Sequence, residues 1–121
     1  MQKETKIRLL TGLGVFLTAF IIYVKTMAAT TSFGDCGEVI AIANILGIPH
    51  PPGYPLYAVI GRTTILMFRF LPEIAARINL LSPLFSAATV AFVYLLTVKL
   101  IVLWRGEPKD DLERLMLHLS G

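Results

Sequence analysis

Two long uncharged runs of apolar residues dominate the pattern along the chain. The second run, residues 78–98, has twenty-one residues, and at 1.5 Å of rise per residue it can cross the roughly 30 Å hydrocarbon core of a bilayer. The first run, residues 9–24, covers only about 24 Å and needs residues 26–29 to complete a span. We therefore predict transmembrane helices over residues 9–29 and 78–104.

The segment between the runs, residues 30–77, follows a different pattern. Apolar residues at helical spacing predict a short helix near residues 37–47, and Pro55 suits the first position of a second helix near residues 55–71. The first of these helices is too short to span a bilayer, and the second carries two arginines that are costly in lipid. We expect both helices to lie at the membrane interface, joined by a stiff turn rich in proline.

Basic residues near both ends of the chain predict its orientation. Lysine and arginine occur in residues 1–8 and again in the tail, residues 105–121, so the positive-inside rule places both ends in the cytoplasm and residues 30–77 outside. The tail predicts an amphipathic helix, which could lie on the membrane surface or dock on another protein. The apolar face of that helix would carry Leu112, Leu115, Met116 and Leu119.

The predicted fold class is an all-α integral membrane protein. It has two transmembrane helices joined by an extracytoplasmic loop with two short interfacial helices, followed by a cytoplasmic amphipathic tail helix. A cleaved signal peptide is the other interpretation of the first run, since a basic start precedes it and Ala28-Ala29 resembles a cleavage site. The length of the run and the second span that follows favour a membrane anchor.

The composition favours a membrane protein over a soluble domain. Hydrophobic residues make up 55% of the chain and charged residues only 16%, against about 25% charged in an average soluble domain. The net charge of +3 comes from residues at helix ends, not from a basic cluster interleaved with aromatics, so nucleic acid is not an expected partner. The lone cysteine, Cys36, cannot form an internal disulfide, and no cysteine–histidine group has the spacing of a metal site.

Two carboxylates, Asp35 and Glu38, stand three residues apart at the start of the predicted helix near residues 37–47. The simplest interpretation is a capping box, in which Asp35 accepts the Glu38 amide and Glu38 reaches back to the Asp35 amide. A carboxylate held rigidly in this way at the membrane surface could also take a proton from an acceptor hydroxyl. It could hold a divalent cation instead, but two carboxylates alone indicate a metal only weakly, so no cofactor or metal is predicted.

Histidine and arginine side chains supply further candidates. His50 is either a hydrogen-bonding residue of the turn or a donor to an acceptor substrate or a phosphate. Arg62 and Arg77 carry forked donors that match phosphate oxygens, although anchoring at lipid headgroups explains them equally well. Tyr54 belongs to the stiff turn, and Asn79 could form a hydrogen bond within a helix bundle.

Several segments, in their order along the chain, carry a resemblance to a known family. They are Thr-Ser-Phe-Gly-Asp-Cys-Gly-Glu at 31–38, Leu-Gly-Ile-Pro-His-Pro-Pro-Gly-Tyr-Pro-Leu at 46–56, Gly-Arg at 61–62 and Ala-Arg-Ile-Asn-Leu-Leu-Ser at 76–82. Together they resemble the N-terminal region of the transmembrane-protein-260-like protein O-mannosyltransferases. More distantly, the layout is similar to that of the GT-C glycosyltransferase superfamily, in which a first span leads to an acidic loop, two surface-lying helices and a second span.

The resemblance implies a membrane glycosyltransferase. Such an enzyme moves a sugar, with mannose as one candidate, from a polyprenyl-phosphate donor to a hydroxyl of a protein or lipid acceptor. The reaction takes place on the outer or luminal face of a bacterial inner membrane or an ER-like membrane. Asp35 is then the expected catalytic base and Glu38 its assistant, and a metal is not obligatory because the leaving group is already a phosphate. The expected substrate-binding residues are His50, Tyr54, Arg62 and Arg77, with Arg62 or Arg77 meeting the donor phosphate.

Members of that family are several times longer than this chain. We therefore expect the 121 residues to be the N-terminal part of a larger enzyme and to be inactive alone. The partners would be the lipid bilayer, the donor, the acceptor, and the remaining transmembrane helices of the enzyme or of a partner subunit. The alternative is a non-catalytic membrane hairpin that acts as an assembly or accessory subunit. A transporter fits less well, because Asp35 and Glu38 lie at a helix exit and not in mid-span.

Overall fold

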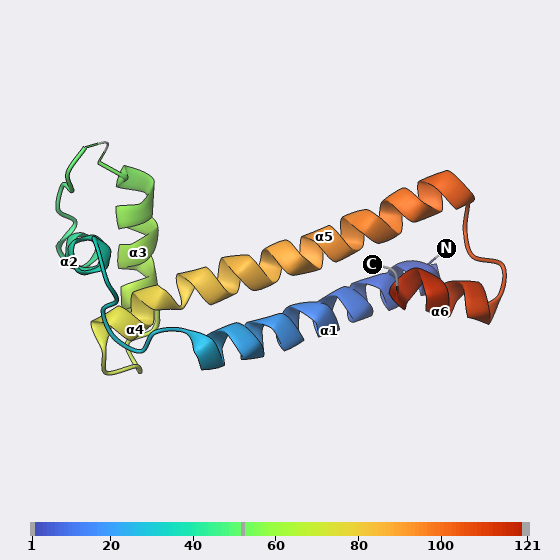
Figure 1. Ribbon diagram of the computed structural model, residues 1–121, viewed down its shortest axis with the longest axis horizontal. Helices are drawn as coiled ribbons and strands as arrows, with labels where there is room; N and C mark the ends of the chain where they lie inside the picture. The colour runs from blue at the N-terminus through green and yellow to red at the C-terminus, as the bar shows by residue number, and fades with distance from the viewer. Residues whose placement is uncertain (1, 52, 120–121) are drawn as a thin grey trace. The chain divides into compact units, whose positions relative to one another are not determined.

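The structure, a computed structural model, describes residues 2–51 and 53–119, and within these ranges its only regular elements are helices. They are α1 (Gln2–Thr26), α2 (Cys36–Ile45), α3 (Pro55–Met67), α4 (Ile74–Asn79), α5 (Leu81–Arg105) and α6 (Asp111–Leu119) (Figure 1). The predicted all-α class is confirmed. Both α1 and the stretch formed by α4 and α5 are long and apolar enough to cross a membrane.

The chain divides by its internal contacts into two units. One unit, residues 24–83, contains α2, α3 and α4 and is called the loop unit below. The other unit, residues 1–23 and 84–121, contains most of α1 and α5 and all of α6, and is called the span unit.

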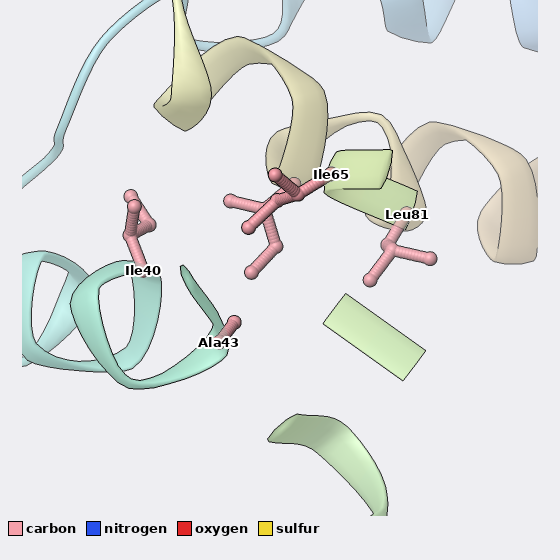
Figure 2. Close-up of a cluster of buried hydrophobic side chains, with 5 residues drawn as sticks. Ile40, Ala43, Ile65 and Leu81 are labelled. Atoms are coloured by element: carbon pink, nitrogen blue, oxygen red, sulfur yellow. The ribbon is translucent and has the colours of Figure 1, made fainter. Parts of the chain in front are cut away.

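The loop unit is built around one cluster of buried apolar side chains. Ile40 and Ala43 of α2 pack with Ile65 of α3, and Ile78 of α4 and Leu81 complete the cluster (Figure 2). Ala43 is fully buried and Ile78 is 1% exposed. Because full burial of one isoleucine or leucine side chain contributes about 1.5–3 kcal/mol, this cluster is the main force that holds α2 against α3 and α4.

The three helices of the loop unit come closest together at Gly61 of α3. A Cβ atom placed on Gly61 would lie 2.8 Å from the Ala43 Cβ atom and 2.8 Å from the Ile78 Cδ1 atom, which is closer than side-chain carbons come. The missing side chain at this position therefore lets α3 contact α2 and α4 at the same point.

The helical stretch that contains the second predicted span is interrupted near its start. Ile78 and Asn79 belong to α4, and α5 begins at Leu81. Pro83 explains the break, because its ring clashes with the carbonyl group four residues earlier and it has no N–H to donate to that group. The carbonyl is that of Asn79, the last residue of α4. Leu80 keeps helical angles of φ −60° and ψ −20°, so the interruption is one residue long.

The boundaries of the other predicted helices also differ. α1 covers residues 2–26 where 9–29 was predicted, because the charged N-terminal residues are good helix formers and continue the helix beyond the apolar run. α2 ends where Leu46 turns into the left-handed region, with φ 55°. α3 ends at Met67, not at residue 71, since Phe68 leaves helical angles with φ −97° and ψ 39°.

The span unit pairs α1 with α5 and folds α6 back beside them (Figure 1). Tyr94 and Val98 of α5 are buried together with Leu117 of α6, and Val15 of α1 packs against this cluster. Arg8 of α1 forms an ion pair with Glu107, which lies between α5 and α6. α6 is therefore held by both of the long helices.

The tail helix α6 turns its polar face, not its apolar face, toward those helices. Arg114 forms an ion pair with Glu4 of α1 at 3.2 Å, and His118 Nδ1 lies 2.6 Å from the hydroxyl oxygen of Tyr94. Leu117 is the buried leucine of α6. The residues of the predicted apolar face are all exposed: Leu112, Leu115, Met116 and Leu119.

Gly61→Ala is expected to destabilise the loop unit. Neither Ala43 nor Ile78 can retreat from a new methyl group without losing buried contacts, and overpacking of this kind costs about 1–3 kcal/mol. The measurement is thermal unfolding of the chain in detergent micelles followed by circular dichroism, where the midpoint should fall.

Gly14→Ala in α1 is the matched control, because a Cβ atom at Gly14 meets no atom within 4 Å. This control should keep or slightly raise the midpoint, since alanine favours a helix over glycine by about 1 kcal/mol. If Gly61→Ala proved as stable as Gly14→Ala, close helix packing would not be the reason for glycine at position 61.

Candidate active site

A hollow of about 340 Å³ opens in the loop unit near the first turns of α2 and α3 and the end of α4. Among the described residues that line it, Asp35 alone carries a charged side chain. The lining consists of Asp35, Cys36, Val39, Ile40, Ile42, Pro49, Tyr54, Tyr57, Ala58 and Asn79. A mainly apolar hollow with a few polar groups is the usual form of a ligand site.

Asp35 reaches the hollow because the chain turns sharply before α2. Gly34 adopts φ +72°, an angle that residues with side chains rarely take, and Asp35 follows as the N-cap residue. The Asp35 carbonyl oxygen accepts the Val39 N–H at 3.0 Å, whereas the carboxylate makes no capping hydrogen bond. The predicted capping box is therefore wrong. With ψ at 5°, Asp35 lacks the extended geometry in which an N-cap side chain reaches the helix amides.

Glu38, the other residue of the predicted box, binds the proline-rich turn instead. Its Oε2 lies 2.8 Å from His50 Nδ1, and its Oε1 accepts the His50 N–H at 3.1 Å. Hydrogen bonds from His50 lower the pKa of Glu38, and the Glu38 carboxylate raises the pKa of His50. Each group thus stabilises the charged form of the other. The pair also ties the first turn of α2 to the segment that connects α2 and α3.

Tyr54 lines the hollow from an unusual backbone conformation. It is the N-cap residue of α3 with φ 39° and ψ 49°, in the left-handed region that costs a residue of this kind about 1–2 kcal/mol. The preceding Gly53 has φ +96°, and its N–H donates to the His50 carbonyl oxygen at 3.1 Å. The Tyr54 and His50 rings meet edge to face, with centroids 6.4 Å apart. Strain of this kind is often retained at functional sites.

Neither of the two candidate arginines lines the hollow. Arg62 of α3 donates Nη1 hydrogen bonds to the carbonyl oxygen of Asn44 and, at 3.2 Å, to its Oδ1, at the end of α2 where a cation suits the helix dipole. Arg77 of α4 donates from Nε to the Leu71 carbonyl oxygen at 2.7 Å and from Nη2 to that of Pro72 at 3.3 Å. Both guanidinium groups are thus hydrogen-bonded to main-chain carbonyl oxygens. The predicted contact of an arginine with a phosphate stays a prediction.

Among the lining residues that were not predicted as site residues, Tyr57 and Asn79 carry a phenol and an amide that could contact a substrate. Tyr57 follows Tyr54 by three positions, and this spacing of about one helical turn could have indicated Tyr57 as a second tyrosine of the site. Burial raises the pKa of Tyr57 further above neutral pH, where a phenol is protonated in any case. Asn79 donates Nδ2 hydrogen bonds to the carbonyl oxygens of Ala28 at 2.9 Å and Thr30 at 3.2 Å. These hydrogen bonds join residues that are far apart in the sequence, so no local sequence pattern predicts them.

The groups that line the hollow indicate which chemistry to test at this site. One carboxylate stands at an apolar hollow beside two phenols and an amide, and such a carboxylate can accept a proton from a bound hydroxyl. Cys36, next to it, is a free and half-buried thiol. Within the described ranges, no three or more histidine, cysteine, aspartate or glutamate side chains come together to hold a metal ion.

Comparison with known proteins identifies the family. The sequence model of the Protein O-mannosyl-transferase TMEM260 N-terminal domain matches residues 35–121, more than half of the chain. The chain belongs to this family. The resemblance predicted from the sequence motifs is thereby confirmed, and the match starts at Asp35 itself.

Two relatives show how much of a TMEM260 protein this chain represents. The Protein O-mannosyl-transferase TMEM260 of Mus musculus is 36% identical over 83 residues, which are 69% of this chain and 12% of the mouse protein. The protein of the same name from Dictyostelium discoideum is 33% identical over 85 residues, which are 67% of this chain and 10% of that protein. The chain therefore spans about a tenth of the length of these relatives. No solved structure matches it.

The Glu38–His50 pair is expected to protect the His50 amide best between about pH 4.5 and 6.5. The contribution of Glu38, whose pKa is lowered from 4.5, is complete above that value and is lost as the pH falls through the lowered pKa. The contribution of His50, whose pKa is raised from 6.5, is complete below that value and is lost as the pH rises through the raised pKa. Hydrogen exchange of the His50 amide, corrected for its intrinsic pH dependence, measures this protection.

Glu38→Gln should lower the protection of the His50 amide and flatten its pH dependence, because the amide side chain cannot ionise. Glu113→Gln is the matched control, since Glu113 accepts the Lys109 N–H at 2.8 Å in the span unit. A pH profile that stayed unchanged in Glu38→Gln would show that this pair does not hold the turn.

Proposed function

We propose that the chain is the N-terminal part of a membrane O-mannosyltransferase and that Asp35 is its catalytic base. The observation that carries the proposal is the Asp35 carboxylate, which lines the apolar hollow and makes no capping hydrogen bond. Because the Asp35 side chain does not cap α2, its carboxylate is available for chemistry. Membership of the TMEM260 N-terminal domain family supports sugar transfer as that chemistry.

The proposed reaction moves one sugar from a polyprenyl-phosphate donor to a hydroxyl of a protein or lipid acceptor. The acceptor oxygen attacks the anomeric carbon of the sugar, and Asp35 takes the hydroxyl proton as the new carbon–oxygen bond forms. The bond between the anomeric carbon and the phosphate oxygen breaks, and polyprenyl phosphate leaves with the electron pair. Polyprenyl phosphate is a good leaving group, so the proposed step needs no metal ion.

Glu38, His50 and Tyr54 support this site in different ways. We assign Glu38 the role of a positioning residue, because its carboxylate is engaged with His50 and not with Asp35. The pair holds the turn that leads to Tyr54, and Tyr54 lines the hollow as a contact for the bound substrate. His50 acts mainly through this turn.

Arg62 and Arg77 are proposed to meet the donor phosphate with N–H groups other than those that now hold the main chain. A guanidinium group has five N–H donors, and each of these arginines uses one or two nitrogen atoms for carbonyl oxygens. Their structural contacts fix the guanidinium groups in place, which favours bidentate binding of an anion over a flexible contact.

Asp35→Asn in the complete enzyme is expected to lower sugar transfer by a factor of about 10²–10⁴, the usual contribution of a general base. The protein should stay folded and inserted, because the carboxylate makes no capping hydrogen bond. The measurement is transfer of labelled mannose from polyprenyl-phosphate mannose to a protein acceptor in isolated membranes.

Asp110→Asn, an exposed position in the segment before α6, is the control for loss of a negative charge and should keep full transfer. Full transfer by Asp35→Asn would contradict the role of Asp35 as base. That result would favour the alternative function, a non-catalytic hairpin that serves as an assembly or accessory subunit.

The hollow is proposed to face the outer or luminal side of the membrane, and Cys36 on its lining can report this. A membrane-impermeant maleimide that has access only to the outer or luminal face is expected to label Cys36, slowly because the thiol is half-buried. The Cys36→Ser variant identifies the labelled site. Labelling that occurs only after the cytoplasmic face is opened would overturn this orientation.

A further inference from the structure

The tail helix α6 leaves one apolar face without a partner in the described part of the chain. Four side chains at positions i, i+3, i+4 and i+7 form this face, which we call the tail stripe. Its members are 57% to 77% exposed: Leu112, Leu115, Met116 and Leu119. The orientation of the stripe is set by the opposite side of the helix, where Arg114 pairs with Glu4 and His118 lies against Tyr94.

The same contacts place α6 along α5. His118 is hydrogen-bonded to Tyr94. Tyr94 lies eleven residues, or about 16 Å, before the last residue of α5. At the other end of α6, Glu113 lines a second hollow together with Trp104 and Arg105 of α5. α6 therefore runs back along the last turns of α5, from Arg105 toward the middle of the span.

We propose that α6 is a re-entrant helix whose tail stripe contacts the acyl chains of the bilayer. The proposal takes α5 as a membrane-spanning helix. Any side of α6 that faces away from both α1 and α5 over the depth between Arg105 and Tyr94 then meets lipid. The usual arrangement of an amphipathic tail, flat on the membrane surface, does not agree with the bond between His118 and Tyr94.

The tail stripe also continues the surface that α5 turns toward lipid. Met116 of the stripe lines the second hollow with Trp104, a residue that is 78% exposed and lies next to the last residue of α5. Tryptophan side chains gather at membrane interfaces. Leu100 and Leu103 of α5 are exposed in the same part of the span. The stripe carries no charge, so its attraction to the bilayer is hydrophobic and should not depend on anionic lipids or on salt.

The test is nitroxide scanning of the full chain in phosphatidylcholine vesicles. Cys36→Ser removes the native thiol, and Leu112→Cys, Leu115→Cys and Leu119→Cys carry the label one at a time. Collisions of the label with oxygen and with a water-soluble nickel complex give its depth. We expect lipid exposure at all three positions, with Leu119 about 10 Å deeper than Leu112 because α6 runs along the span.

Two control positions make every result decisive. Leu100→Cys on α5 should be exposed to lipid. Glu113→Cys, near the N-terminal end of α6, should lie close to the water. Equal depths at Leu112 and Leu119 would mean a helix flat on the surface, and low collision rates with both reagents would mean that protein covers the stripe. Either result, or exposure of Leu100 to water, would overturn the proposal.

Discussion

Gly61 lets α3 touch Ala43 of α2 and Ile78 of α4 at one point, and the candidate active site depends on this contact. α2 carries Asp35 at its first turn, α3 carries Tyr57, and α4 ends in Asn79. Since the buried cluster below them is small, only a close approach of the helices brings these three residues to one hollow. A side chain at position 61 would separate the helices that supply the lining.

The loop unit shows how a tertiary contact can overrule a local one. Asp35 and Glu38 have the spacing of a capping box, and in an isolated helix that arrangement would satisfy two amides. In the folded chain, Glu38 gains a charged hydrogen bond and a backbone hydrogen bond from His50, which is more than one local amide offers. As a result, the carboxylate of Asp35 stays at the hollow and the turn before Tyr54 is held in place.

The contacts of the span unit agree with those expected of a protein in lipid. Lipid tails are as apolar as leucine, so apolar side chains gain little by packing against another helix, and polar contacts decide which side of a helix turns inward. Arg114 and His118 of α6 accordingly face α1 and α5, while the leucines of the tail stripe face outward. In water the same helix would be expected to dock the other way round.

The sequence by itself determined the all-α class, the two long apolar segments and the family, because these depend on composition, run length and short motifs that are read locally. The break before α5 was not predicted, because the uncharged run continues through Pro83. Tertiary structure alone decided that Glu38 binds His50, that Tyr57 and Asn79 line the hollow with Asp35, and that α6 turns its polar face inward. The physical reason is that helical periodicity shows which residues share a face, whereas the partner of that face depends on contacts between residues far apart in the chain.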